Sequence, residues 1–220
     1  MQHTFMEQPQ ERRCAYQICR YPVSLIDIWS LRNGTRLTLR PVLPQDSGLL
    51  GNLIQGLSST TRYNRFHGVV KALSADTLQQ MTCVDYRQHV AFVITAFDGG
   101  LERVVADARF VVDSSGEGAE FALVVDDRWQ RLGLGERAMQ ALAHAADRQG
   151  LSWLYGSVLS ANAPMLALMQ RCQYFCATNR YDERLVCVEK SLGAHAVQTR
   201  AVRRHWSSRW LSALRSPTLN

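Results

Sequence analysis

Apolar residues alternate with polar ones in some segments of the chain and recur at helical spacing in others. Residues 36–40 alternate, as the residues of a half-buried strand do. Longer apolar runs have the length of buried strands, and the joints between them are rich in Gly, Asp and Ser, which is typical of hairpin turns. These runs occupy residues 89–97, 103–112 and 120–125. This part of the chain therefore predicts antiparallel strands joined by tight turns.

Helical spacing of apolar residues is found in four segments: 49–57, 74–81, 136–146 and 162–172. Three further apolar runs have the length of strands: 153–159, 174–177 and 185–188. The predicted order is one strand, two helices and three strands, followed by a helix, a strand, a helix and two strands. Hairpins followed by β-α-β crossovers predict an α/β (α+β) fold with a mixed, mostly antiparallel sheet flanked by helices.

The length and composition fit one domain with appendages. A chain of 220 residues with 46% hydrophobic content can bury one substantial core. We expect this domain to occupy residues 35–192. Residues 1–34 show no clear pattern and are expected to be a leader of uncertain order, although Val23, Ile26, Ile28 and Trp29 offer an edge strand.

The positive charge of the chain is concentrated in its last segment, residues 193–220. The net charge is +6, and the five arginines after residue 190, with no acidic residue among them, carry +5 of it. The rest of the chain is nearly neutral, which argues against a specific nucleic-acid-binding domain. Val202, Trp206, Trp210 and Leu214 are spaced four apart, as on one face of a basic amphipathic helix. We therefore expect either an anionic partner for this tail or a solvated extension.

The remaining composition excludes several classes of protein. The six cysteines have irregular spacings and form no Cys-x-x-Cys pair, so no metal site is indicated. Residues 1–13 lack the apolar core of a signal peptide, and no segment reaches the ~20 apolar residues of a membrane span. A cytoplasmic location is therefore expected.

A glycine-containing loop joins the apolar run that ends at Val125 to the next predicted helix. Gly133 and Gly135 leave this loop without side chains just where a helix begins, so that successive main-chain N–H groups can bind an anion. Dinucleotide and P-loop motifs require other residues at these positions. The remaining alternative is that the glycines only end a strand and let the helix pack closely on the sheet.

The motif Gln130-x-x-Gly133-x-Gly135 resembles the coenzyme A pyrophosphate loop of the GNAT acyltransferase superfamily. Residues of about 36–190 are similar to the catalytic domain of bacterial protein lysine acetyltransferases. The segments that carry this similarity are Leu39-Arg40-Pro41-Val42-Leu43-Pro44, Tyr63-Asn64-Arg65-Phe66, Val84-Asp85-Tyr86-x-x-His89 and Ala119-Glu120-Phe121-Ala122.

This resemblance implies the GNAT fold and an N-acetyltransferase that uses acetyl-CoA as co-substrate and no metal. Protein lysines are the favoured acceptors, for example in an acyl-CoA synthetase. Two alternatives stay open. The acceptor is a small amine such as a polyamine, an aminoglycoside or an amino acid, or the protein is a non-catalytic regulator that binds acyl-CoA.

The expected catalytic residue is Glu120. A lysine amine with a pKa of ~10.4 is protonated at neutral pH and needs a base before it can attack a thioester. The resemblance assigns this role to Glu120, whereas the sequence alone also allows a solvated carboxylate at the start of a strand. Many GNAT enzymes place a Tyr that protonates the leaving thiolate where this chain has Met169, and the general acid is therefore left open, with Tyr174 nearby.

The resemblance also implies a set of residues that bind the coenzyme: Leu123, Val124, Val125, Gln130, Arg131, Leu132, Gly133, Leu134, Gly135, Glu136 and Asn162. The main chain of residues 123–125 is expected to bind the pantetheine arm and to polarise the thioester. Asn162 is also in the position of an N-cap for the following helix. Asp85, Tyr86 and His89 are candidates for the acceptor site, although a capping Asp, a packed Tyr and a surface His are the alternative interpretation.

Overall fold

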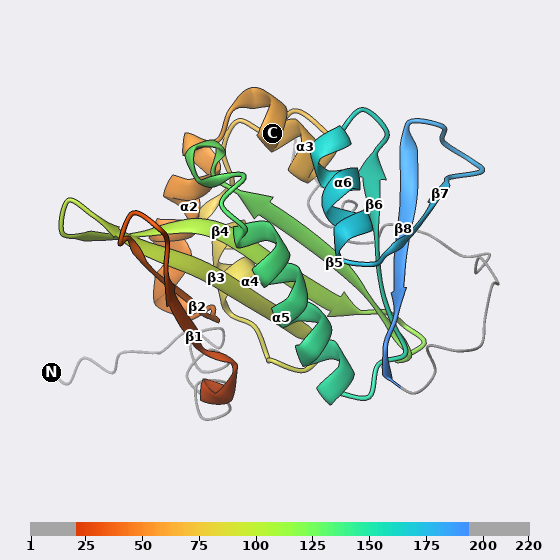
Figure 1. Ribbon diagram of the computed structural model, residues 1–220, viewed down its shortest axis with the longest axis horizontal. Coiled ribbons are helices and arrows are strands. Elements are labelled where there is room, and N and C mark those ends of the chain that lie inside the picture. The colour runs from red at the N-terminus through yellow and green to blue at the C-terminus, as the bar shows by residue number, and fades with distance from the viewer. Residues whose placement is uncertain (1–20, 194–220) are drawn as a thin grey trace, which may run out of the picture.

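The computed structural model describes residues 21–193, and the predictions for residues 1–20 and for the basic tail 194–220 lie outside this range. The strands are β1 (Asp27–Ser30), β2 (Arg36–Pro41), β3 (His89–Asp98), β4 (Leu101–Val112), β5 (Gly118–Val125), β6 (Trp153–Leu159), β7 (Phe175–Thr178) and β8 (Leu185–Ser191). The α-helices are α2 (Ser47–Gly56), α3 (Ser59–Phe66), α4 (Ala75–Thr82), α5 (Leu134–Arg148) and α6 (Ala163–Arg171) (Figure 1). In this part of the chain, no helix is both long and apolar enough to span a lipid bilayer.

The strands form one sheet in the order β1-β2-β3-β4-β5-β6-β8-β7. All neighbours are antiparallel except β5 and β6, which are parallel and are connected through α5. The predicted mixed sheet is therefore confirmed, including the hairpins and the β-α-β crossover.

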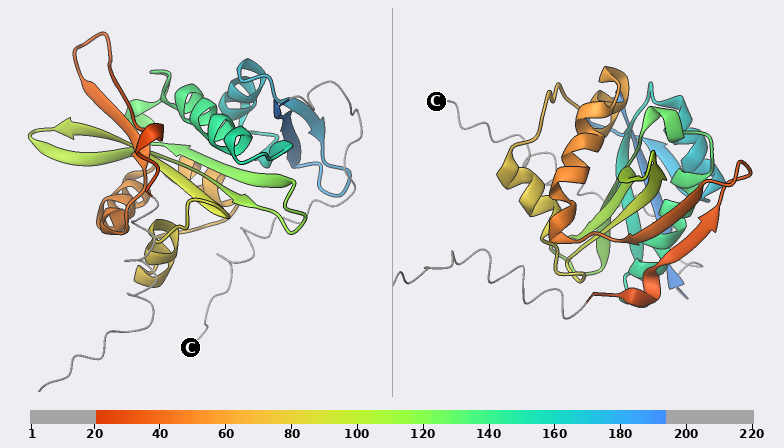
Figure 2. Two further views of the ribbon diagram at one scale, coloured as in Figure 1. Left: turned by 90° about the horizontal axis from the view of Figure 1, so that it is seen from below. Right: turned by 90° about the vertical axis from the view of Figure 1, so that its left-hand side faces the viewer.

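Helices cover both faces of the sheet. Helices α5 and α6 pack on one face, and α2, α3 and α4 pack on the other (Figure 2). The central strands β3 and β4 are consequently buried on both faces. This double burial explains why their sequences are continuous apolar runs, whereas β2, which lies between β3 and the edge strand β1, alternates buried residues with exposed or half-buried ones.

The apolar spacing that predicted α5 is confirmed by its packing. Ala138, Leu142, Ala145 and Ala146 are at most 2% exposed and face the sheet. Small residues on this face allow the helix to lie close to the strands. The close approach is needed because the N-terminus of α5 must reach the end of β5 through a short loop.

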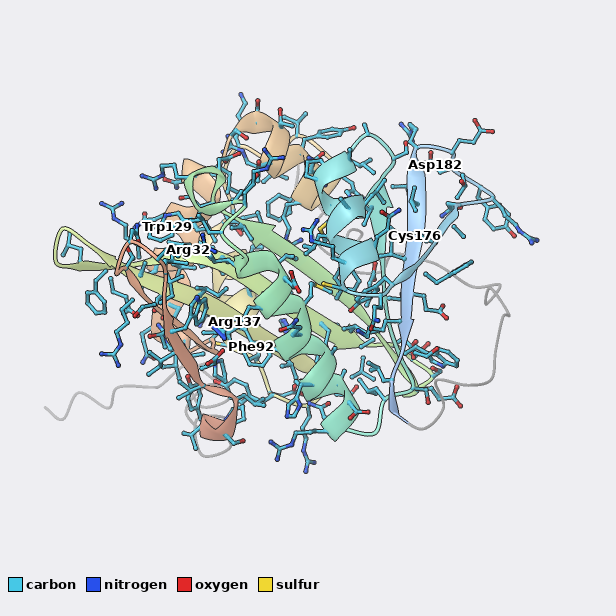
Figure 3. All side chains as sticks on the ribbon, in the orientation of Figure 1. Arg32, Phe92, Trp129, Arg137, Cys176 and Asp182 are labelled. Atoms are coloured by element: carbon cyan, nitrogen blue, oxygen red, sulfur yellow. The ribbon has the colours of Figure 1, made fainter. Side chains whose placement is uncertain are left out.

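Two elements differ from the predicted order. Helix α3 was not predicted, because it has no apolar stripe: among its residues only Arg65 and Phe66 are buried. The edge-strand alternative for the segment before residue 35 is confirmed, since β1 pairs with β2. Arg137 of α5 holds this strand, with its guanidinium 4.3 Å from the ring centre of Trp29 and 3.2 Å from the Asp27 carboxylate (Figure 3 labels Arg137).

The parallel strands β5 and β6 pair over only a short part of their length. Their register begins at Gly118↔Trp153 and ends at Glu120↔Tyr155, and beyond this point the strands diverge (Figure 1). The ring of Phe121 lies where they part, over Gly156 of β6 and edge-on to Tyr174 at a centroid distance of 5.4 Å. Phe121 therefore acts as a wedge that fits only because position 156 has no side chain.

We predict that Gly156→Ala lowers the free energy of unfolding by about 1–3 kcal/mol. A methyl group at this position would lie 3.0 Å from the Phe121 ring, and the buried ring has to shift. Chemical denaturation measures the effect. Gly48→Ala is the control, because a methyl group on Gly48 in α2 meets no atom within 4 Å. The control should be at least as stable as the wild type, and a Gly156→Ala variant as stable as the wild type would contradict the wedge.

Candidate active site

A cleft of about 790 Å³ opens where β5 and β6 part. One wall consists of residues 120–125 of β5, and the opposite wall contains Ser157 and Val158 of β6 and the start of α6. Helix α3 and the loop between β5 and α5 close the cleft at its ends. The cleft thus contains both the predicted base and most of the predicted coenzyme site.

The β5 wall offers unpaired main-chain groups. Residues 121–125 pair with β4 on one side, but the pairing with β6 has already ended at Glu120. An exposed strand edge of this kind hydrogen-bonds an extended ligand through its N–H and C=O groups. The predicted pantetheine-binding residues Leu123, Val124 and Val125 all lie on this edge and line the cleft.

The N-terminus of α5 forms a second binding surface. Gly133 is its N-cap, with φ at +84°, and no side chain caps the helix. Within the described residues, no acceptor binds the main-chain N–H groups of residues 133–136. These donors and the positive end of the helix dipole can bind an anion, as the sequence predicted.

The two glycines of the loop are needed for different structural reasons. Gly133 needs its positive φ, and a Cβ atom there would meet no protein atom within 4 Å. Gly135 instead allows close packing, because a Cβ atom would lie 3.0 Å from Leu168 of α6. Close packing of the helix therefore accounts for Gly135, whereas at Gly133 the anion site stays a prediction.

The other predicted coenzyme residues are distributed unevenly around the cleft. Arg131, Glu136 and Asn162 line it, and Asn162 also caps α6 by accepting a hydrogen bond from Met165 N–H at 3.3 Å. The side chain of Leu134 is buried in the core, and that of Leu132 is 46% exposed outside the cleft lining. These two leucines can therefore contribute only main-chain groups.

Gln130 lines the cleft and fixes the start of the loop. Its side-chain Nε2 lies 3.2 Å from the carbonyl oxygen of Val125 and 3.5 Å from the Thr61 hydroxyl. The side chain therefore connects the end of β5 to helix α3.

Glu120 lines the cleft at the last position of β5 that pairs with β6. It shares a sheet face with Asp107 and Arg109 of β4, since Val111↔Glu120 and Arg109↔Ala122 are neighbouring pairs in register. Arg65 of α3 covers this face and also lines the cleft. The carboxylate is thus placed where the two strands part, beside a buried guanidinium.

Arg65, Asp107 and Arg109 form a buried charge cluster beneath the cleft. Arg109 donates two hydrogen bonds to the Asp107 carboxylate, and Arg65 Nη2 is 3.6 Å from the same group. Burial lowers the pKa of Arg65 to about 10, although Asp107 opposes the effect, so the Arg65 guanidinium is still charged at neutral pH. The Asp107 carboxylate is therefore shared by two guanidinium groups. The negative charge of Glu120 also stabilises the charged form of Arg65.

The predicted acceptor residues Asp85, Tyr86 and His89 do not line the cleft. Asp85 accepts hydrogen bonds from the main-chain N–H groups of Arg87 and His89, and the Tyr86 hydroxyl donates to the carbonyl oxygen of Val42. Burial and the charge of Arg109 lower the pKa of His89 well below its ordinary value, so the imidazole is neutral. These contacts give all three residues structural roles, and a role of any of them at the acceptor site stays a prediction.

Helix α3 supplies the cleft residues that sequence reasoning missed. Asn64, Arg65 and the following His67 line the cleft together with Glu120. In the sequence, residues 63–66 contribute to the family resemblance but give no sign of a place in the site. Its position was not predictable, because a short polar helix has no periodic signal.

Neither Tyr174, the candidate for the general acid, nor Met169, at the position where the resemblance expects an acidic Tyr, lines the cleft. Met169 is fully buried in the core. Among the described residues, the buried Tyr174 hydroxyl has no hydrogen-bond partner, and burial, together with Cys172, raises its pKa. Among residues 21–193 no group of three or more potential metal ligands is found.

Comparison with known proteins identifies relatives of this arrangement. Residues 62–174 match the model of the acetyltransferase (GNAT) family. Acetyltransferase Pat of Mycolicibacterium smegmatis is 38% identical over 142 residues, which cover 64% of this chain and 42% of that protein. Acetyltransferase PA5475 of Pseudomonas aeruginosa is 33% identical over 141 residues, which cover 63% of this chain and 76% of that protein. The chain thus spans less than half of the first relative.

The structural comparison agrees with the sequence comparison. The crystal structure of the GNAT domain of S. lividans PAT superposes with a TM-score of 0.69 and covers 78% of this chain and 99% of that domain. The two sequences are 24% identical. This structural similarity establishes the fold of the chain, and the site residues do not enter into it.

We predict that Gly133→Ala weakens binding of acetyl-CoA by about tenfold or more, because the methyl group projects into the space that the N–H groups of α5 face. The positive φ adds a folding cost of about 1–2 kcal/mol. Isothermal titration calorimetry measures the affinity.

Gly34→Ala is the matched control for this substitution. Gly34 has the same φ of +84° and the same open surroundings, but it lies in the turn between β1 and β2. The control should lose stability to a similar extent and keep its affinity. Equal affinities of the two variants would remove the anion cradle from the account.

Proposed function

The chain belongs to the GNAT acetyltransferase family, and we propose that it transfers an acetyl group from acetyl-CoA to the side-chain amine of lysine residues in a protein. The observation that carries the proposal is the position of Glu120. Its carboxylate lies where the unpaired edge of β5 begins, between that edge and helix α3. A base at this point can serve an acceptor that enters from the α3 side.

The residues of the cleft fit acetyl-CoA. The unpaired edge at residues 121–125 suits an extended arm with amide groups, and the free N–H groups of residues 133–136 suit a pyrophosphate. When bound, acetyl-CoA would supply the acetyl group as a thioester. The main chain of β5 and α5 would hold and orient it.

Glu120 would remove the proton that keeps the acceptor unreactive. A lysine arrives as an ammonium ion, and its nitrogen has no lone pair for attack. The Glu120 carboxylate would accept this proton directly or through a water molecule. The charged cluster of Arg65, Asp107 and Arg109 lies on the same face and holds the surrounding backbone rigid through buried hydrogen bonds.

Protein lysine as the acceptor rests on the relatives and on the resemblance of the motif around Glu120. The relatives are named Pat and PA5475, and the structural neighbour is the GNAT domain of a PAT protein. The surface beside α3 adds exposed apolar groups, since Tyr63 is 44% and Val69 is 88% exposed. Such a rim suits contact with a protein better than enclosure of a small amine.

The direct test is acetyl transfer from labelled acetyl-CoA to a panel of acyl-CoA synthetases and, in parallel, to polyamines, aminoglycosides and amino acids. We expect label on a synthetase lysine, identified by peptide mass spectrometry. Label on small amines alone would reassign the acceptor. Tight binding of acetyl-CoA without transfer to any of these acceptors would favour a regulator.

We predict that Glu120→Gln lowers kcat about 10²-fold or more at pH 7 and leaves the affinity for acetyl-CoA nearly unchanged, because only proton removal is lost. Raising the pH should restore part of the rate as the acceptor amine deprotonates by itself. Steady-state kinetics from pH 7 to pH 10 measure both effects. Glu183→Gln, in the exposed loop before β8, is the control. Wild-type turnover of Glu120→Gln at pH 7 would exclude Glu120 as the base.

A further inference from the structure

The carboxylate of Asp127 connects two segments that are 69 residues apart in the sequence. Asp127 begins η4 (Asp127–Trp129), in the loop between β5 and α5. It accepts hydrogen bonds from the main-chain N–H of Ser58 at 2.8 Å, the Ser58 hydroxyl at 2.8 Å and the Thr61 hydroxyl at 2.6 Å. The coenzyme loop is thereby joined to the first turn of α3.

The neighbouring polar groups fix the direction of these hydrogen bonds. Ser58 is the N-cap of α3, and its hydroxyl oxygen accepts a hydrogen bond from the N–H of Thr61 at 3.1 Å, so its own hydrogen is donated to Asp127. Gln130 Nε2 lies 3.5 Å from the Thr61 hydroxyl oxygen and 3.2 Å from the Val125 carbonyl. A continuous polar bridge therefore runs from the end of β5 to α3.

The bridge determines the position of helix α3, which forms the side of the cleft that faces the acceptor and is called the acceptor wall below. Helix α3 is short, and its last turn carries Asn64 and Arg65 into the cleft near Glu120. A shift of its first turn would displace both residues. Asp127 therefore acts on this wall from the coenzyme side of the cleft.

The charge of Asp127 is unfavourable for the anion that this loop binds. Asp127 itself lines the cleft, and within the described residues no cationic side chain pairs with it. The adjacent Asp126, in contrast, is paired with Arg128 at 2.9 Å. Burial tends to raise the pKa of Asp127, but the hydrogen bonds from Ser58 and Thr61 lower it below its ordinary value, so the carboxylate is ionised at neutral pH.

We propose that Asp127 is a positioning residue that holds the acceptor wall against the coenzyme loop and that its charge reduces the affinity for acetyl-CoA. The proposal rests on the proposed function, because it assigns opposite effects to the two substrates of that reaction. Asp127 does not take part in proton transfer. It acts through Ser58, Thr61 and the helix that they begin.

The test compares three variants of the full chain. In Asp127→Asn, the charge is removed and one acceptor oxygen is replaced by a donor. We expect kcat/KM for the protein acceptor to fall about ten- to hundredfold, because the acceptor wall is misplaced. The affinity for acetyl-CoA should rise about two- to fivefold at low ionic strength, and this gain should disappear at high salt.

The double variant Ser58→Ala/Thr61→Val separates position from charge. It removes both hydroxyl donors and keeps the carboxylate, so acceptor kinetics should fall without any gain in acetyl-CoA affinity. Asp182→Asn is the control for charge alone. Its carboxylate binds Arg184 in the loop between β7 and β8, on the opposite side of the molecule from Trp129 of the coenzyme loop (Figure 3). It should behave as wild type in both assays.

Amide hydrogen exchange provides a readout that does not depend on activity. The amides of residues 59–66 should exchange faster in Asp127→Asn and in the double variant, and at the wild-type rate in Asp182→Asn. Unchanged exchange and unchanged acceptor kinetics in Asp127→Asn would overturn the proposal, as would an equal loss of affinity for both substrates. If the wild-type protein acetylates no protein, the proposed function fails, whereas calorimetry and amide exchange still decide whether Asp127 joins the two segments.

Discussion

The early end of pairing between β5 and β6 is the constraint on which the site depends. Unpaired main-chain groups inside a sheet are costly unless water or a ligand satisfies them. Here they lie along residues 121–125 and open onto the cleft. The Phe121 ring packs over Gly156 where the strands part, and the open edge is present in the folded structure without a ligand. Glu120 is the last residue before this edge, and its position follows from the same constraint.

The two ends of the cleft have opposite electrostatic requirements. The N-terminus of α5 provides free N–H groups for an anion, whereas an incoming lysine is a cation that needs a carboxylate. The structure separates these requirements along one strand, with Glu120 at one end of the open edge and the glycine loop beyond the other. The Asp127 bridge then fixes the distance between the coenzyme loop and the helix that faces Glu120. Binding of one substrate and placement of the other are thereby linked in a single framework.

Periodic apolar patterns predicted most of the fold and part of the site. The central strands bury side chains on both faces and α5 buries one face against the sheet, and this burial leaves a regular signal in the sequence. Helix α3 leaves none, since most of its residues face solvent or the cleft, and it supplies the acceptor wall. Asp85 and His89 are acceptor candidates only through the family resemblance, and in the structure they form a capped turn and a neutral imidazole outside the cleft lining. The splay of two parallel strands is a tertiary property, and no local sequence pattern predicts it.

The central claim is that the open edge of β5 and the start of α5 form one binding surface for acetyl-CoA. Backbone amide chemical shifts, recorded during titration with acetyl-CoA, test this claim most directly. The account predicts large shifts at residues 121–125 and 133–136, and small shifts in α4, which packs on the opposite face of the sheet from α5 and does not line the cleft. Saturable binding with the largest shifts elsewhere, for example in the hollow between β1 and α5 near Arg137 and His144, would contradict it.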